Sequence, residues 1–333
     1  MEKRNQLVDM LKGYACFLVV FGHVIMGIRK AGIVSNGALV LENFIWTFHV
    51  ALFMFLSGYV YHLNGDWKNK NSVKKFIGYK LLNLGIPYLI FSIIYILING
   101  VMSSAVNNEF KTEDILFLWK TPVAQYWFLY ALFWLFVIFS ILGQWLRNWG
   151  ITVIIFLINI LLGILQLNVG ILDSALSMGF IFGLGASIDS ISLLSKRWYV
   201  KVACVIFHII AVLIILPTYL DKIWIGSQIE ACIGIVGSIA FIDILSNVEI
   251  IKKILLWICK YSFPIYLLHT IFTAGIRIAL FKSGIDNYWI HIVSGVVLGI
   301  GIPYIGACIT RKLKALDFFF YPSRTIKSLK KNG

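Results

Sequence analysis

The sequence predicts an all-α, polytopic integral membrane protein of about ten transmembrane helices with both termini in the cytoplasm. Apolar residues make up 60% of its 333 residues, which is enough for ten spans of about 20 residues each. Charged residues make up only 13%, about half the share found in soluble domains. The Lys and Arg residues, in addition, gather in alternate loops. This composition excludes a water-soluble domain, a disordered chain and a nucleic-acid-binding domain.

Apolar runs divide the chain into the ten predicted spans, at about 7–28, 44–63, 76–100, 126–146, 151–167, 174–192, 199–217, 223–246, 261–281 and 288–310. A proline, Pro87, is expected to kink the third span. We find no internal repeat and no linker between domains. We therefore expect a single transmembrane domain over residues 1–315, followed by a basic and aromatic cytoplasmic tail over 316–333 that lies in the membrane interface as an amphipathic segment.

The distribution of basic residues favours one orientation, because cytoplasmic loops of membrane proteins are enriched in Lys and Arg. If the N-terminus is inside, 20 of the 29 Lys and Arg residues fall in inner segments and six in outer segments. The net charge of +14 also suits the anionic inner leaflet of a plasma membrane. We expect a multi-pass protein of the plasma membrane, with a bacterial source.

The first span holds the densest set of polar residues, Asp9, Lys12 and His23. Lys12 and His23 are eleven residues apart, so they share one helix face and lie about 16 Å apart along the axis. Asp9 and Lys12 also fit an ion pair at the inner headgroups, with Lys12 snorkelling. His23 lies well inside the apolar run, where an imidazole needs a hydrogen-bond partner for each nitrogen. The polar residues on this helix face therefore predict a functional site.

Two further spans add candidates to the same site. His49 stands near the outer end of the second span, at a depth similar to His23. Ser57 and Gly58 lie in the middle of this span, where they allow close helix packing. Lys80 lies just inside the third span. It either snorkels to the inner surface or binds an anionic cofactor that enters from the cytoplasm, with Lys68, Lys70, Lys74 and Lys75 as the electrostatic approach.

Polar residues in later spans complete the set. His269 lies in the middle of the ninth span, and Glu230, Gln125 and Tyr126 are further candidates. Arg277 is expected to snorkel toward the outer surface. Three other histidines have no supporting neighbours in the sequence and are expected to be structural, namely His62, His208 and His291.

Four segments resemble the acyltransferase-3 family of integral-membrane O-acyltransferases. The first helix reads R-x4-D-x2-K-x10-H, from Arg4 to His23, and the second reads H-x3-F-x3-SGY, from His49 to Tyr59. QYWFLYALFW at 125–134 is similar to an aromatic segment of that family, and YSFPIYLLHT at 261–270 is similar to a late motif. The order and spacing match over nearly the whole chain.

The resemblance implies transfer of an acyl group, most often acetyl, from acetyl-CoA or another acyl-CoA to a hydroxyl of a sugar, exopolysaccharide or lipid-linked glycan. It implies His23 as the catalytic histidine, with His49 as a second catalytic candidate. Lys12 stands where the family has Arg, and the third span reads Lys80-Leu-Leu-Asn83 where members show R-x2-R. We expect Asp9, Lys12 and Lys80 to bind the donor, and we expect no metal. The other candidates are Ser57, Tyr126, Trp127, Glu230, Tyr266 and His269.

Two mechanisms and two rival functions remain open. His23 either removes a proton from the acceptor hydroxyl as it attacks the thioester, or takes the acyl group itself and passes it on. The partners expected of an enzyme are acyl-CoA from the cytoplasm, a glycan acceptor, membrane lipids and polysaccharide-synthesis proteins, and not nucleic acid. The rivals are a proton-coupled transporter or flippase and a non-catalytic membrane partner in polysaccharide synthesis and export.

Overall fold

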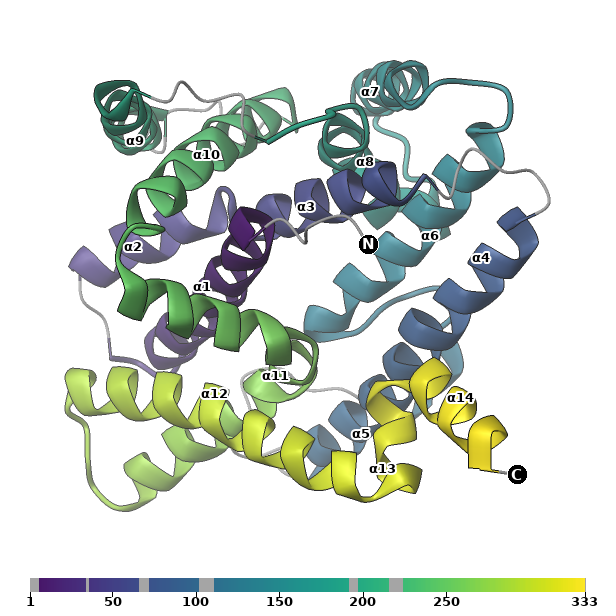
Figure 1. Ribbon diagram of the computed structural model, residues 1–333. Helices are drawn as coiled ribbons and strands as arrows, with labels where there is room; N and C mark the ends of the chain where they lie inside the picture. The colour runs from purple at the N-terminus through teal and green to yellow at the C-terminus, as the bar shows by residue number, and fades with distance from the viewer. Residues whose placement is uncertain are drawn as a thin grey trace.

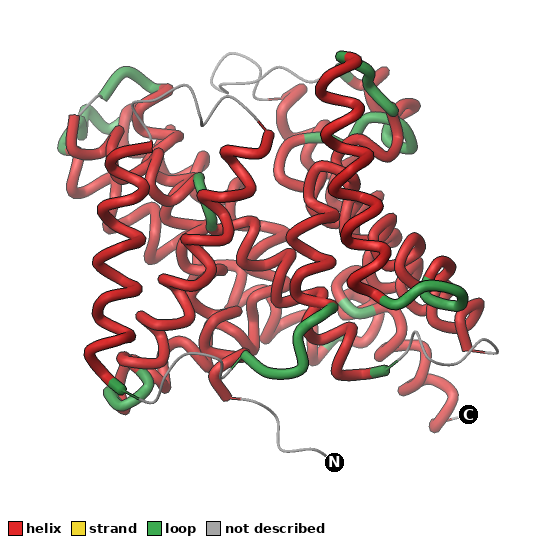
Figure 2. Tube along the Cα trace, turned by 90° about the horizontal axis from the view of Figure 1, so that it is seen from above, coloured by secondary structure: helices red, strands yellow, loops and turns green. Residues whose placement is uncertain are grey.

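The computed structural model is a bundle of α-helices (Figures 1 and 2). It describes residues 6–33, 36–65, 72–101, 111–191, 197–215 and 224–332, and no strand occurs within these ranges. Helices dominate because backbone groups in lipid have no water to bind and must pair within the segment. The first eight helices are α1 Gln6–Lys30, α2 Asn36–Trp46, α3 His49–Asn64, α4 Val73–Lys80, α5 Ile86–Val101, α6 Trp127–Leu142, α7 Asn148–Leu165 and α8 Asp173–Ala186. The remaining six are α9 Trp198–Ile215, α10 Trp224–Leu245, α11 Glu249–Lys282, α12 Tyr288–Lys312, α13 Lys314–Phe320 and α14 Pro322–Asn332.

Each of the ten predicted runs coincides with one helix or with two consecutive helices, which confirms the all-α membrane fold class. Eight segments in the described part of the chain are long and apolar enough to cross a membrane. The other two predicted runs correspond to shorter apolar helices, at 170–186 and 198–214. A count of ten crossings and the cytoplasmic location of both termini stay predictions.

Helix directions follow from the contacts between neighbours. On α1 and α11, Gly13 packs against Leu255 and Gly27 packs against Arg277, so the two helices run parallel. On α7 and α8, Thr152 contacts Gly183 whereas Ile155 contacts Gly179, so these helices run antiparallel. Both directions are those that alternate crossing of the membrane requires for these spans.

The first helix occupies the centre of the bundle. α1 packs against α11 and α12 on one side and against α3 and α10 on the other (Figure 1). Its N-terminal half joins a hydrophobic core with α3, α6 and α8, and its C-terminal half joins a second core with α11 and α12. A position on α1 is therefore surrounded by protein rather than by lipid.

Small residues set a close contact between α3 and α8. A Cβ atom added to Gly58 of α3 would lie 1.9 Å from the carbonyl oxygen of Phe182 on α8, and one added to Gly185 would lie 2.0 Å from that of Phe55. The two backbones therefore touch at reciprocal glycines, as small residues permit in membrane bundles. This contact confirms the close packing expected at Gly58.

The predicted second and third spans are interrupted. A break at Thr47 and Phe48 separates α2 from α3. In the third span a π-helical turn, Leu81–Gly85, separates α4 from α5. Pro87 follows this turn and has no N–H to donate to the carbonyl of Asn83, so the regular pattern of hydrogen bonds changes there.

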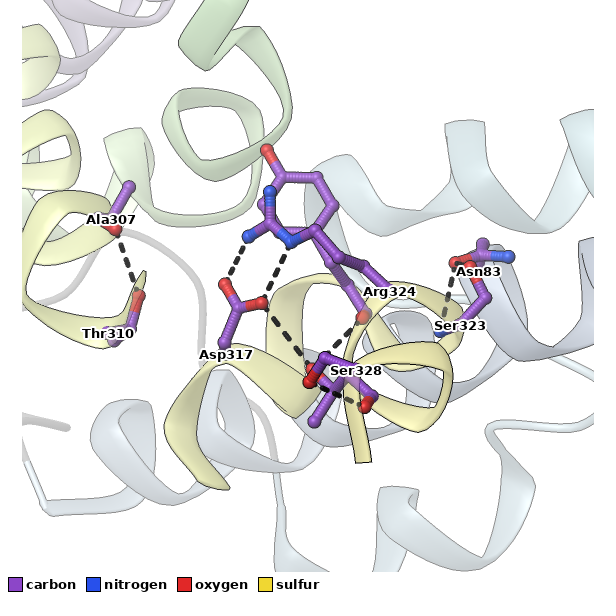
Figure 3. Close-up of polar contacts among 9 residues, drawn as sticks. Asn83, Ala307, Thr310, Asp317, Ser323, Arg324 and Ser328 are labelled. Atoms are coloured by element: carbon purple, nitrogen blue, oxygen red, sulfur yellow. Dashed lines mark hydrogen bonds and ion pairs between the residues drawn. The ribbon is translucent and has the colours of Figure 1, made fainter. Parts of the chain in front are cut away.

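The C-terminal segment folds back onto the third span as α13 and α14. Arg324 of α14 holds Asp317 of α13 in a bidentate ion pair, with Nε 2.9 Å from Oδ2 (Figure 3). The hydroxyl of Ser323 donates to Oδ1 of Asn83 over 2.8 Å. Asn83, which stands where the second cation of the family motif was expected, thus anchors the tail. The first turn of α1 and the end of α14 lie toward the same side of the bundle in Figure 2.

Candidate active site

A cavity of about 610 Å³ lies between α1, α3, α5, α6 and α11. Its volume is within the range of small-molecule sites, about 300–1,000 Å³. The wall is mainly apolar and aromatic. Among the predicted site residues, five line it, namely His23, His49, Gln125, Trp127 and Tyr266.

His23 projects from α1 into this cavity and has other rings around it. Its ring centroid lies 5.0 Å from that of His269 on α11 and 5.5 Å from that of Trp46 at the end of α2. Within the described residues, neither nitrogen of His23 has a hydrogen-bond partner. The imidazole is half-buried, so both a proton acceptor and a proton donor are presented to a ligand in the cavity.

His269 is held in one tautomer by the backbone of its own helix. Its Nδ1 lies 3.1 Å from the carbonyl oxygen of Ile265 and 2.8 Å from that of Tyr266. A carbonyl can only accept, so Nδ1 carries the hydrogen and Nε2 of the neutral ring carries a lone pair. That Nε2 is buried and has no hydrogen-bond partner among the described residues. Nε2 of His269 is therefore a hydrogen-bond acceptor beside His23 to which no described group donates.

His49 is fixed in the same way by the break between α2 and α3. A continuous helix would have its backbone N–H donate to the carbonyl of Ile45. Because of the break, the carbonyl of Ile45 instead accepts from Nδ1–H of the His49 side chain at 2.8 Å and from the backbone N–H of Phe48 at 3.3 Å. The Nε2 of neutral His49 is therefore also an acceptor, and its ring lies 5.0 Å from that of Trp46. The sequence could not reveal this, because the apolar run continues through the break.

The segment at 124–126 is clamped to α11. The amide of Gln125 donates to the hydroxyl of Thr270 over 2.6 Å, and the hydroxyl of Tyr266 donates to the carbonyl of Gln125. Ala124 has a φ of 44°, a strained value for a residue other than glycine that is most often found at functional sites. The hydroxyl of Tyr126 donates to the carbonyl of Leu267 over 2.8 Å. Tyr126 therefore joins two helices and does not line the cavity.

The predicted donor-binding residues lie away from the cavity wall. Asp9 is buried against α11, with Oδ1 3.7 Å from Sγ of Cys259. Lys80 places its ammonium 3.7 Å from the ring centroid of Phe136, a cation–π contact. Lys12 lies on α1, toward its N-terminal end. The approach residues Lys74 and Lys75 are exposed, and Lys68, Lys70 and the motif residue Arg4 lie outside the described residues.

Two other candidates belong to helix contacts. Ser57 lies beside the contact between α3 and α8. Glu230 is buried on α10, with 3% of its surface exposed. Neither lines the cavity. Within the described residues, no group of three or more His, Cys, Asp or Glu side chains could hold a metal ion.

The structure adds two residues to the site that the sequence left aside. Arg277 lines the cavity and turns toward α1, where its Nη1 would lie 2.4 Å from a Cβ atom at Gly27. His291 shares a second hollow of about 10 Å³ with His23, Thr273 and Arg277, a volume near that of one water molecule. An arginine in an apolar run was the available signal for Arg277, but the neighbour of His291 is 268 residues away in the chain.

Two of the histidines that were expected to be structural make contacts elsewhere in the bundle. Nε2 of His62 lies 2.9 Å from Oδ1 of Asp189. His208 is buried against Phe44 and Phe48. These two histidines lie outside the cavity.

A family model described as an acyltransferase domain, the acyltransferase-3 domain, matches residues 5–308. No curated protein matches the chain, and no solved structure does. The matched region contains every helix that forms the cavity. The chain belongs to the acyltransferase-3 family and is a membrane acyltransferase.

Proposed function

We propose that the protein transfers an acyl group, most often acetyl, from acyl-CoA to a hydroxyl of a sugar, exopolysaccharide or lipid-linked glycan in the plasma membrane of a bacterium. The observation that carries this proposal is His23, an imidazole with both nitrogens available at the wall of a small-molecule cavity inside a membrane acyltransferase. Acyl transfer to a hydroxyl needs a base of this kind at the reacting oxygen.

In the proposed reaction, His23 accepts the proton of the acceptor hydroxyl while the oxygen attacks the thioester carbonyl. The carbon–sulfur bond then breaks, and the leaving thiolate takes the proton from the imidazolium. In the alternative order, the acyl group first passes to a nitrogen of His23 and then to the acceptor. Both orders release one free thiol for each ester formed.

We assign His269 as a positioning residue for His23. The lone pair on its Nε2 can accept the N–H of the His23 ring after a small rotation, since the two ring centroids are 5.0 Å apart. That hydrogen bond would leave the lone pair on the other nitrogen of His23 for the acceptor hydroxyl, as a third group orients the base in a triad. His49 faces the same cavity and is proposed to hold the acceptor.

We propose that the donor approaches from the cytoplasmic side. Asp9 and the cations Lys12 and Lys80 would stand near its phosphates, and the pantetheine arm would extend toward His23. The axial distance from Lys12 to His23, about 16 Å, suits that arm.

Release of free thiol from acetyl-CoA by the purified protein, in the presence of glycan acceptors, tests the proposal. We expect release that depends on protein and acceptor. A transporter, a flippase or a non-catalytic partner would consume no thioester, so a complete absence of thiol release in folded protein would contradict the proposal.

A further inference from the structure

The side chain of Arg277 turns into the bundle and faces the cavity. A snorkelling arginine near the outer end of α11 would extend toward the membrane surface. The side chain instead turns toward α1, where the absence of a side chain at Gly27 leaves room for Nη1. It lines both the cavity and the small hollow beside His23. Within the described part of the chain, Arg277 forms no hydrogen bond and no ion pair.

The cavity as a whole has an excess of positive charge. Among the described residues of its wall there is no Asp or Glu, whereas Arg277 and Lys30 both belong to it. The acidic residue Glu42 is already occupied, because Nε and Nη2 of Arg29 donate to its two oxygens over 2.8 Å each. A guanidinium in an apolar wall is costly to leave without a counter-charge. The wall therefore favours a ligand that brings its own negative charge.

Arg277 lies at a distance from His23 that suits a ligand with both an acidic group and a hydroxyl. Gly27 follows His23 by four residues on α1, one helical turn or about 6 Å along the axis. The guanidinium against Gly27 thus lies about one sugar ring away from the imidazole. A carboxylate or phosphate bound there would direct a hydroxyl of the same or the adjoining sugar residue toward His23.

We propose that the outer end of the cavity binds an acidic group, a carboxylate or phosphate, of the acceptor glycan, with Arg277 as its principal ligand and Lys30 as a second cation. This inference rests on the proposed acyl transfer and specifies its acceptor class as an acidic sugar. The planar guanidinium pairs with a carboxylate or phosphate through two parallel hydrogen bonds. A neutral sugar would leave the arginine without a counter-charge.

Equilibrium binding of radiolabelled D-glucuronate and D-glucose to the protein in phosphatidylcholine nanodiscs, without acyl-CoA, tests this site. We expect the wild type to bind glucuronate more tightly than glucose. Arg277→Gln should weaken glucuronate binding at least tenfold, the scale of one charge-assisted contact, and leave glucose binding unchanged. Arg277→Lys, which keeps the charge but not the two parallel bonds, should lose part of the affinity and provides a folded comparison.

Lys282→Gln is the matched control, since Lys282 is an exposed cation on the same helix and does not line the cavity. It should bind glucuronate as the wild type does. Equal affinity of the wild type for both sugars, or equal losses in Arg277→Gln and Lys282→Gln, would overturn the inference. So would loss of glucuronate binding when phosphatidylglycerol is added, because a lipid phosphate would then be the occupant.

The binding assay separates this inference from the proposed function. Glucuronate binding that depends on Arg277, without any thiol release, would contradict acyl transfer but keep the acidic-ligand site. Thiol release with neutral sugars that is unaffected in Arg277→Gln would keep acyl transfer and contradict the acidic acceptor.

Discussion

Single residues define the chemistry that the cavity offers. His269 and His49 each donate Nδ1–H to a backbone carbonyl, so each presents a lone pair on Nε2 when neutral. His23 has no such internal partner among the described residues. His269 and His49 are therefore suited to accept a hydrogen bond from a neighbour or a ligand, and His23 is suited to exchange a proton.

The role of His269 has a specific kinetic consequence. His269→Ala removes the acceptor beside His23, and we expect kcat to fall about tenfold, a loss near 1.4 kcal/mol, with the donor KM unchanged. His269→Gln offers a carbonyl oxygen in place of Nε2 and should recover part of the rate. Steady-state thiol release measures both. A change confined to KM, or no recovery in the glutamine variant, would assign His269 to packing instead.

The donor end is tested at Lys12. Lys12→Arg keeps the charge and should be tolerated. Lys12→Ala removes a charge-assisted contact worth about 1.5–3 kcal/mol, so the KM for acyl-CoA should rise at least tenfold while use of the acceptor is unchanged. An unchanged donor KM in folded Lys12→Ala would leave this lysine as an interfacial residue only.

At the scale of elements, helix ends and interruptions position the site. The break before α3 turns His49 toward Ile45, and the clamp between 124–126 and α11 fixes one wall of the cavity. The sequence predicted the runs that contain these elements, because lipid demands apolar stretches of sufficient length. It could not predict the break, the π-helical turn as such or the φ of Ala124, since each depends on contacts with other helices.

The reciprocal glycines of α3 and α8 make a prediction about stability. In Gly58→Ala the new Cβ would lie 1.9 Å from the Phe182 carbonyl oxygen, so the helices must separate, at a cost of about 1–3 kcal/mol. Gly163→Ala on α7 is the matched control, because no atom lies within 4 Å of its Cβ position. Thermal unfolding in detergent should show a lower Tm for Gly58→Ala only. Equal Tm values would contradict the close contact.

At the scale of the whole molecule, α1 and α11 run parallel and α7 and α8 run antiparallel, as alternate crossing of a membrane requires. The parallel pair α1 and α11 brings His23 and His269 together although 246 residues separate them in sequence. That pairing could not be predicted from sequence periodicity, which specifies the face of a helix but not its neighbour. For the same reason Arg277 was expected to snorkel and His291 to be structural, and neither was placed beside His23.

Orientation is tested by cysteines placed at the two ends of α11, in a background without the native cysteines. Asp286→Cys and Asn247→Cys replace exposed residues on either side of this helix. An impermeant thiol reagent should label position 286 in intact cells and position 247 only after permeabilisation. Outside labelling at 247 would reverse the orientation and with it the proposed entry of acyl-CoA.

The central claim is that His23 performs the proton transfer. Asn retains some of the hydrogen bonds of His but cannot take up a proton at neutral pH. In purified, folded His23→Asn we expect thiol release from acetyl-CoA in the presence of acceptor to fall by about a hundredfold or more, the scale of general-base catalysis. Donor binding should persist, because the proposed phosphate contacts lie about 16 Å away. A folded His23→Asn protein that releases thiol at a rate near that of the wild type would contradict the account.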